Sequence, residues 1–409
     1  MRATKVIWLL LALATPVSGC KKTSTESGVS EADINAAIRG NTALAIDLCR
    51  QLCSSEGNLL FSPYSISTNL ALLHAGARGK TEEEVAKMLH FSLAQERFHR
   101  VSGELHRRLS KIQEVGQIEL SLASSLWPQH SVKFRSDYLS LTEKYYGASI
   151  TAVDYGNARQ ACDRINRWVE EKTEHKISNL IAPEMFDEQT CLVLVNAIYF
   201  KGSWADQFDP RDTKNHLFYV TPQESVQIPM MFRKGEGRYA QVDGLQVLEL
   251  PYTGNDLSMV IFLPIAKDGL SRIEEILSAD TLLSWKRQLR EQQVTMYIPR
   301  FMISYGCQLK RTFQTLGMID AFEKSADFSG MTEGNTGFHV NEVIHQAFIE
   351  VNEEGTEAAA ATGGSVTFSR KDSPPRPIFR ADHPFLFLIQ NNSDGNILFL
   401  GRVVNPGER

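Results

Sequence analysis

Two features typical of membrane and nucleic-acid-binding proteins are scarce in this sequence. The apolar stretch near the N-terminus, Val6–Val17, holds about a dozen residues, whereas a helix needs about 20 to span a bilayer. Positive charge is also limited, because 43 Lys and Arg residues stand against 48 Asp and Glu residues, a net charge of −5 at pH 7. We therefore expect no spanning helix and no broad basic surface for a nucleic acid.

Motifs that carry common catalytic chemistry are missing too. The chain has no His-Glu-x-x-His zinc motif and no Gly-x-Ser-x-Gly turn around a nucleophilic serine. Residues Gly79–Thr81 resemble the end of a phosphate-binding loop, but His74 occupies the position of the upstream glycine, and a helix is expected there. These absences predict a protein that is not an enzyme and that uses neither a metal nor a cofactor.

The first 30 residues have the composition of an export signal followed by a tether. Arg2 and Lys5 precede the apolar stretch Val6–Val17, and Val-Ser-Gly-Cys20 then resembles the bacterial lipobox, in which the cysteine becomes lipidated. Residues 21–30 are polar, as in a flexible linker. We predict a signal peptide over 1–19, a lipidated Cys20 with a tether over 20–32, and a folded domain over 33–409. An ordinary signal peptide with a coincidental cysteine is the alternative.

Cysteine is sparse, and its spacing indicates no disulfide framework. Once Cys20 is assigned to the lipid, an odd number remains. Cys49 and Cys53 lie four residues apart in a helical pattern and so share one helix face, yet no further metal ligand stands near them. We expect mostly buried free thiols at five positions, which are Cys49, Cys53, Cys162, Cys191 and Cys307.

A long segment near the C-terminus, Glu350–Arg376, joins two strand-like runs, Val343–Asn352 and Pro384–Ile389. Structureless connections of this length are usually functional or disordered. At period two, the face that runs from Thr356 to Phe368 carries no charge and no proline. The segment is therefore a latent strand that can enter a sheet with one face buried. A flexible linker would explain the small residues equally well.

Three stretches carry a family resemblance. Residues 352–362, Asn-Glu-Glu-Gly-Thr-Glu-Ala-Ala-Ala-Ala-Thr, resemble the reactive-loop hinge of inhibitory serpins. Residues 379–389, Phe-Arg-Ala-Asp-His-Pro-Phe-Leu-Phe-Leu-Ile, are similar to the serpin C-terminal signature, and 61–67 are similar to the family's Phe-Ser-Pro-x-Ser-Ile-Ser block. Further blocks in the family's order extend the resemblance over about residues 33–406.

The resemblance implies an α+β fold with a single serpin-like domain. This fold has a large mixed central β-sheet, smaller sheets, surrounding helices and an exposed reactive-centre loop, here about 353–378. The residue patterns themselves predict a strand buried on both faces at Cys191–Phe200 and a helix over Leu270–Leu289. Thr81, with a glutamate three residues further on, is expected to cap the start of another helix.

The resemblance also implies inhibition of a serine protease, or of a cysteine protease, by a suicide mechanism. The protease would cleave the loop, form an acyl-enzyme, and be trapped covalently as the loop inserts into the central sheet. Family spacing from the hinge places the cleaved bond at Ser369-Arg370, with Phe368-Ser369 and Arg370-Lys371 left open. The hinge would comprise Glu353, Glu354, Gly355, Thr356, Glu357, Ala358, Ala359, Ala360, Ala361 and Thr362.

Two polar groups match family positions beneath and above the sheet. The first resembles the serpin shutter, a buried cluster where strands must part, and it comprises Ser62, Ser65, Asn196 and His345. The second resembles the breach, where the loop enters the sheet, and it comprises Trp204, Arg300 and Glu353, with the last two matching the family's ion pair.

Two other functions remain open. A non-inhibitory serpin-like lipoprotein would bind a ligand or act like a chaperone, although such proteins tend to carry bulky, charged or proline residues in the hinge. An enzyme would reveal itself by hydrolysis of small esters or peptides. The basic side chains between Phe98 and Lys111 form either a solvated helix face or a polyanion site. We expect an exported monomer, able to polymerise, that is lipid-anchored at the bacterial cell envelope or surface, or extracellular, and touches the membrane through its N-terminal lipid alone.

Overall fold

The computed structural model describes residues 28–91, 93–115, 118–334, 337–356 and 376–408. The predicted signal peptide and Cys20 lie outside the described residues. The helices within these ranges are α1 (Glu31–Leu52), α2 (Pro63–Gly76), α3 (Gly79–Met88), α4 (Gln95–Val115), α5 (Ser136–Tyr146), α6 (Ala158–Lys172), α7 (Leu270–Ile276), α8 (Ala279–Arg287) and α9 (Lys310–Thr315), with 3-10 turns at Tyr155–Asn157, Pro183–Met185, Pro210–Asp212 and Asp320–Phe322. The strands are β1 (Leu59–Phe61), β2 (Ile118–Pro128), β3 (Ser149–Ile150), β4 (Leu192–Ser203), β5 (Lys214–Tyr219), β6 (Ser225–Val242), β7 (Leu245–Pro251), β8 (Leu257–Pro264), β9 (Arg290–Pro299), β10 (Phe301–Gln308), β11 (Glu342–Val351), β12 (Gly355–Thr356), β13 (Ile378–Arg380), β14 (Phe385–Asn391) and β15 (Ile397–Val403).

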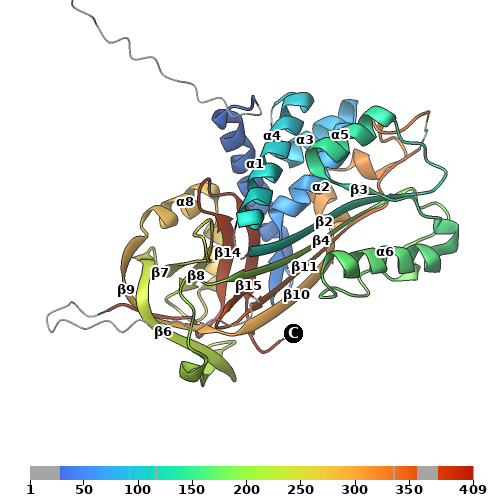
Figure 1. Cartoon of the computed structure of the whole chain (residues 1–409). Helices are drawn as coiled ribbons and strands as arrows, with labels where there is room; N and C mark the ends of the chain where they lie inside the picture. The colour runs from blue at the N-terminus through green and yellow to red at the C-terminus, as the bar shows by residue number, and fades with distance from the viewer. Residues whose placement is uncertain (1–27, 92, 116–117, 335–336, 357–375, 409) are drawn as a thin grey trace, which may run out of the picture.

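A six-stranded sheet has β4 and β11 near its centre. Its order is β10-β11-β12-β4-β2-β3, and it is mixed, because β11 pairs with β4 and β2 with β3 in parallel. Strands β2, β4, β11 and β10 lie side by side across the molecule in Figure 1. The parallel ladder between β4 and β11 runs from Val193↔Glu342 to Phe200↔Ile349, and we call it the β4–β11 seam.

A nine-stranded sheet forms the other half of the molecule. Its order is β1-β15-β14-β8-β7-β6-β9-β13, with β5 paired to β6 beside this path. Strands β6 to β9 lie at the lower left of Figure 1, and β14 and β15 approach the six-stranded sheet at the centre. Mixed sheets with surrounding helices confirm the α+β fold class that the sequence predicted.

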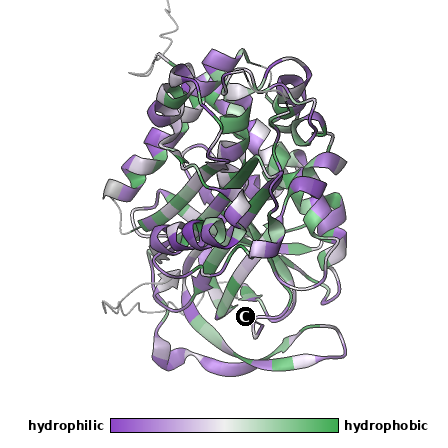
Figure 2. Cartoon of the chain, turned by 90° about the vertical axis from the view of Figure 1, so that its right-hand side faces the viewer, coloured by the Kyte–Doolittle hydropathy of each residue, from purple (hydrophilic) through white to green (hydrophobic). Residues whose placement is uncertain are grey.

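The predicted strand at Cys191–Phe200 is β4, and it is buried on both faces. Side chains alternate along a strand, so Val195 and Tyr199 face helix α6 while Leu194 and Ile198 join the cores on the other side. Helix α6 packs on this face of the sheet with buried residues at helical spacing, such as Ile165. Figure 2 shows this arrangement as hydrophobic strands inside and hydrophilic outer helix surfaces. Within the described residues, no helix combines the length and apolarity needed to cross a membrane.

The stretch predicted to be helical, Leu270–Leu289, forms two helices, α7 and α8, rather than one continuous helix. Ser278 is extended between α7 and α8, and its hydroxyl accepts a hydrogen bond from the backbone of Thr281 at 3.1 Å. The Thr281 hydroxyl in turn accepts from the backbone N–H of Ser278 at 2.8 Å. This reciprocal capping box starts a new helix inside what is a continuous apolar pattern in the sequence.

The predicted capping role of Thr81 is wrong. Helix α3 already begins at Gly79, so Thr81 lies within its first turn. Its hydroxyl donates to Asp320 Oδ2 at 2.5 Å and accepts from the backbone of Asp327 at 2.9 Å. Both partners are distant in sequence, and these tertiary bonds replace the local one that the pattern predicted.

Candidate functional site

The chain turns back within four residues where it leaves β11. The backbone N–H of Asn352 donates to the carbonyl oxygen of Gly355 at 2.8 Å. The side-chain Oδ1 of Asn352 accepts from the N–H groups of Glu354, at 3.1 Å, and Gly355, at 3.3 Å. Such an Asx turn reverses the chain, so β12 runs antiparallel to its neighbours and lies between β11 and β4.

Gly355 makes this position of β12 sterically allowed. Its φ of +152° is rarely adopted by residues with a side chain. A Cβ atom there would overlap the carbonyl oxygen of Gly202 and lie 2.6 Å from the Cα of Ser203, both on β4. The absence of a side chain therefore lets the hinge pair closely with β4, where Gly355 is opposite Ser203.

Thr356 is fully buried at the mouth of the seam. Its Oγ1 lies 2.9 Å from the hydroxyl of Tyr252, and the Tyr252 ring stacks on Trp204 with centroids 4.7 Å apart. Burial raises the pKa of Tyr252 above its usual range, despite the opposing hydrogen bond from Thr356, so the phenol stays protonated and available as a donor. The first side chain of β12 is thus fully buried beside an uncharged phenol.

An ion pair between Glu353 and Arg300 holds the hinge. The buried Glu353 carboxylate accepts from Arg300, with Nε at 2.7 Å and Nη2 at 2.5 Å, and from the hydroxyl of Thr213. The backbone is held as well, because Trp204 Nε1 donates to the carbonyl of Asn352 at 3.0 Å. The structure brings Trp204, Arg300 and Glu353 to one place.

A buried polar cluster bridges the seam further along, which we call the Ser62–His345 cluster. Asn196 on β4 and His345 on β11 are direct partners in the ladder, so their side chains share one sheet face. His345 Nδ1 lies 2.6 Å from Asn196 Oδ1, and the backbone N–H of Ser62 donates to His345 Nε2 at 3.1 Å. Asn196 Nδ2 donates to Ser65 Oγ at 2.5 Å and to Ser124 Oγ at 3.1 Å.

The cluster has a defined protonation state. Because Nε2 of His345 accepts from Ser62, its Nδ1 carries the proton and donates to Asn196. Burial lowers the pKa of His345 to about 3, so the ring is neutral at physiological pH. The Ser62 hydroxyl donates to the carbonyl of Leu398 at 2.6 Å and accepts from the N–H of Ser65. Both ring nitrogens of His345 and the Ser62 hydroxyl are thus used in hydrogen bonds that join the strands. His345 is therefore not placed as a general base beside a free nucleophilic hydroxyl.

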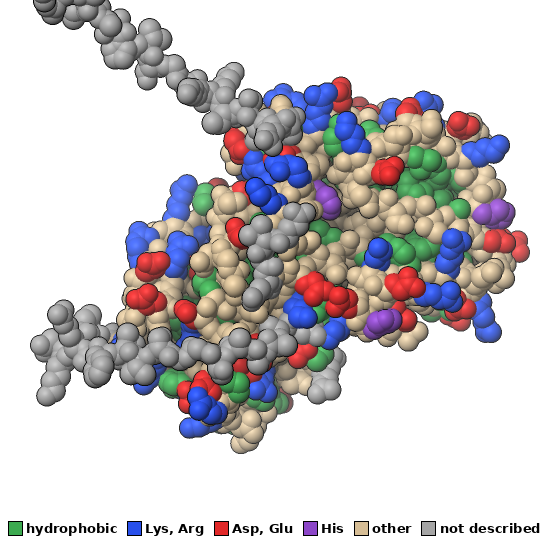
Figure 3. All heavy atoms as spheres, in the orientation of Figure 1, with side chains coloured by type: hydrophobic (Ala, Val, Ile, Leu, Met, Phe, Trp, Pro, Cys, Tyr) green, Lys and Arg blue, Asp and Glu red, His purple; other side chains and the backbone are tan. Residues whose placement is uncertain are grey.

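The basic helix between Phe98 and Lys111 belongs to α4, and part of its charge is neutralised. Buried Glu104 accepts from Arg107 at 2.8 Å and from Arg108 at 3.1 Å. His99 points inward, with Nδ1 2.6 Å from the hydroxyl of Tyr146. Figure 3 shows Lys and Arg interspersed with Asp and Glu over the visible face. In the ranges that the structure describes, no group of three or more His, Cys, Asp or Glu could hold a metal.

Several predicted site residues lie outside the described residues. They are the distal hinge, Glu357, Ala358, Ala359, Ala360, Ala361 and Thr362, and the candidate bond positions Phe368, Ser369, Arg370 and Lys371. Conversely, sequence reasoning missed Asn352, Thr213 and Tyr252, which hold the hinge. Only Asn352 left a local signal, because an asparagine three residues before a glycine is typical of a turn.

Comparisons with known proteins agree with this geometry. The family model described as serpin (serine protease inhibitor) matches residues 39–406. Serpin B3 of Homo sapiens is 38% identical over 392 residues, covering 91% of this chain and 100% of that protein. The leukocyte elastase inhibitor of Sus scrofa is 41% identical over 381 residues, covering 90% of this chain and 98% of that protein. The chain belongs to the serpin family.

A solved structure extends the likeness to the fold. The crystal structure of Serpin48, described as a highly specific serpin in the insect Tenebrio molitor, has a TM-score of 0.81 at 31% identity. The match covers 92% of this chain and 98% of that one.

Proposed function

We propose that this protein inhibits a serine protease by offering its loop as a substrate and then inserting the cleaved loop between β4 and β11. The observation that carries the proposal is the position of β12, which is already paired with both strands at the mouth of the seam. An inserted strand would continue β12 in the direction it already takes. Membership of a family described as serine protease inhibitors supports the same function.

The chemistry begins at the exposed loop. The protease serine attacks the carbonyl carbon of Ser369, the Ser369-Arg370 bond breaks, and Arg370 becomes a new N-terminus. The acyl bond holds the protease on the Ser369 side while that side inserts. A small residue before the cleaved bond favours an elastase-like target, and the 41% identity to a leukocyte elastase inhibitor supports that choice. Cleavage after Phe368 or Arg370 would indicate a chymotrypsin-like or trypsin-like target instead.

Insertion replaces the parallel β4–β11 ladder by two antiparallel ladders, one on each side of the new strand. The parallel pairs of the seam must separate, from Phe200↔Ile349 at the hinge end to Val193↔Glu342 at the far end. The new strand then forms antiparallel ladders with both β4 and β11 and buries its uncharged face. Such an exchange requires a native fold that is kinetically trapped above a more stable inserted state.

The polar residues have distinct parts in this proposal. The hydrogen bond between Asn196 and His345 crosses the seam, so it must break when the strands part. Arg300 and Glu353 hold the hinge at the mouth until the loop is cut. The function we propose for both groups is to keep the seam closed while the loop is intact.

We also propose that the protein is exported and lipid-anchored through Cys20 at a bacterial cell envelope or surface. The support is the sequence alone, a positive start, an apolar core and Val-Ser-Gly-Cys20. Labelled palmitate fed to expressing cells would be incorporated into the parent and not into a Cys20→Ser variant. Equal labelling of both, or of neither, would contradict lipidation.

The decisive experiment on inhibition incubates the purified protein separately with an elastase, a chymotrypsin and a trypsin. A complex that survives boiling in detergent would establish covalent trapping, and the mass of the released C-terminal peptide would fix the cleaved bond. Cleavage without a complex but with a large rise in melting temperature would mean that insertion occurs too slowly to trap those proteases. Cleavage with neither result would point to a non-inhibitory member of the family.

A further inference from the structure

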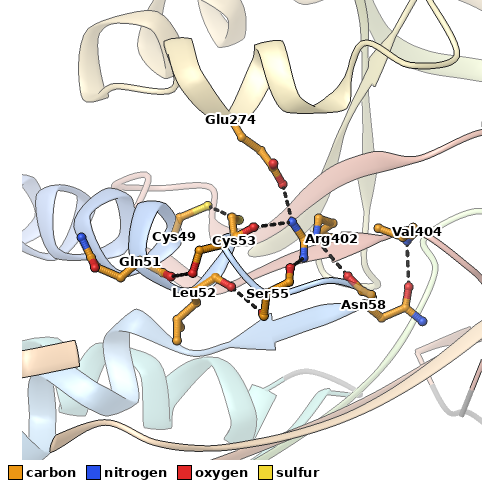
Figure 4. A network of polar contacts seen from close by, with 11 residues as sticks. Cys49, Gln51, Leu52, Cys53, Ser55, Asn58, Glu274, Arg402 and Val404 are labelled. Carbon is orange, nitrogen blue, oxygen red and sulfur yellow. Dashed lines mark hydrogen bonds and ion pairs between the residues drawn. The ribbon is translucent and has the colours of Figure 1, made fainter. Parts of the chain in front are cut away.

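Two thiols meet in the last turn of helix α1. The Sγ atoms of Cys49 and Cys53 lie 3.2 Å apart. Figure 4 shows the two side chains pointing toward each other. Cys53 is the C-cap of the helix, and its backbone N–H still donates to the carbonyl of Cys49 at 2.8 Å. Cys49 is buried, whereas Cys53 is partly exposed at the protein surface. The pair therefore joins a partly exposed residue to a buried one.

The helix geometry is compatible with a bond between the two sulfurs. With a rise of about 1.5 Å per residue and a Cα radius of about 2.3 Å, residues four apart have Cα atoms about 6.2 Å apart. Disulfides tolerate Cα separations of about 4.4–6.8 Å. Closing the ring requires the sulfurs to approach from 3.2 Å to about 2 Å. The end of a helix yields to such a shift more readily than its middle does.

The chain that follows Cys53 is firmly held from the other side. Arg402 donates to the carbonyl oxygens of Cys53 at 3.1 Å, Ser55 at 2.5 Å and Gly57 at 3.0 Å, and it pairs with Glu274 at 3.0 Å. Figure 4 shows these bonds converging on the guanidinium group. These bonds from Arg402 hold the backbone at Cys53 in place beside the last turn of α1, so the Cys53 thiol stays near that of Cys49.

Two of the three other described cysteines, Cys162 and Cys191, have backbone acceptors instead of a second thiol. Cys162 donates to the carbonyl of Ile181 at 2.8 Å, and Cys191 to the carbonyl of Gln189 at 3.4 Å. Both are thiols with backbone acceptors, which makes them suitable controls.

We propose that Cys49 and Cys53 form a redox-active dithiol that a low-molecular-weight disulfide converts to an intrachain disulfide. The Cys53 thiolate attacks one sulfur of the oxidant, whose S–S bond breaks and releases its first half as a thiol. Cys49 then attacks the Cys53 sulfur, and the second half leaves as a thiol. Two protein thiols are oxidised, the oxidant is reduced to two thiols, and these carry off both protons.

The electrostatics of the pair set the pH dependence of this reaction. Contact with the Cys49 thiol, burial and the charge of Glu274 raise the pKa of the Cys53 thiol, and Arg402 opposes them. The attacking thiolate is therefore scarce at neutral pH. Below the pKa its population grows about tenfold per pH unit, so closure accelerates as the pH rises.

The test incubates the reduced, full-length protein with oxidised glutathione, followed by intact-mass measurement and peptide mapping. We expect the mass to fall by two hydrogen atoms, without a retained glutathione, and the loss to map to the peptide that holds Cys49 and Cys53. Dithiothreitol should restore the original mass. Peptide mapping also separates any reaction at Cys20 from that of the pair.

Matched variants decide the outcome. Cys49→Ala should retain glutathione on Cys53, Cys53→Ala should lose no hydrogen, and Cys162→Ala should close as the parent does. The proposal is overturned if the parent keeps glutathione on Cys53 as Cys49→Ala does. It is also overturned if Cys53 stays reduced in both proteins, because that result would show the thiol to be inaccessible.

Discussion

The hinge end and the middle of the β4–β11 seam are held by different forces. At the hinge, the contacts are charged and close to solvent, since the Arg300 side chain is 43% exposed while that of its partner Glu353 is 4% exposed. Further along, the Ser62–His345 cluster is buried and neutral, and its hydrogen bonds join side chains to one another and to the backbone. Charge reversal should therefore open the hinge, whereas acid should loosen the cluster.

The largest expected effect comes from Thr356→Arg. This change places a charge at a fully buried position beside Tyr252, and burying an unpaired charge costs several kcal/mol. The loop should still be cut, but covalent trapping should fall by about two orders of magnitude, since 1.4 kcal/mol corresponds to a factor of ten. Denaturing gels of protease mixtures measure the trapped fraction.

The matched control for this change is Ser225→Arg, at an exposed position at the start of β6. It should trap protease as the parent does. If Thr356→Arg also trapped protease normally, burial of this side chain would not be part of insertion.

Glu353→Lys should have the next largest effect, because it sets a second cation beside Arg300. Because the Arg300 side chain is 43% exposed, we expect a cost below the ~3–5 kcal/mol that is typical of a fully buried ion pair. We expect β12 to leave the seam, which opens an edge that the loop of another molecule can enter, so the variant should polymerise on mild heating. Size-exclusion chromatography before and after heating detects the polymers.

Glu354→Lys makes the same charge change one residue along, at a half-buried position whose backbone carbonyl accepts from Trp204. This variant should stay as monomeric as the parent. A Glu353→Lys protein that also remained monomeric would show that the ion pair does not keep the seam closed.

Acid should weaken the cluster through His345. Its pKa is about 3 in the folded protein and about 6.5 when unfolded, so the unfolded chain binds the proton more readily between these values. Stability is complete above pH 6.5 and is lost as the pH falls toward 3. For this residue alone we expect a loss of about 2 kcal/mol between pH 7 and pH 5, at about 1.4 kcal/mol per pH unit.

Urea unfolding at the two pH values measures this loss, and His345→Gln should show a pH effect smaller by about the same amount. His130→Gln, at a largely exposed histidine, should leave the effect unchanged. An identical pH effect in the parent and in His345→Gln would show that protonation of His345 does not cause the loss of stability in acid.

The same contrast explains how much of the site the sequence could predict. Asn196 lies in the apolar run Cys191–Phe200, which predicts a strand buried on both faces, so its burial follows from the sequence. The hinge contacts do not, because Tyr252 reaches Thr356 across 104 residues and Thr213 reaches Glu353 across 140. The predicted capping role of Thr81 was wrong for the same reason, since its partner Asp320 is 239 residues away. Local patterns predict which face a residue occupies but not which distant side chain meets it.

The smallest expected effect tests one of those unpredicted contacts. Tyr252→Phe keeps the stacked ring on Trp204 but leaves the buried Thr356 hydroxyl without its partner, a loss of about 1 kcal/mol. Backbone hydrogen exchange in residues 350–356 should accelerate about fivefold. Tyr239→Phe, in the other sheet, should leave that exchange unchanged. If Tyr252→Phe also left it unchanged, the hinge would be held by Glu353, Trp204 and the Asn352 turn without help from the Tyr252 hydroxyl, and charge rather than burial would decide when the seam opens.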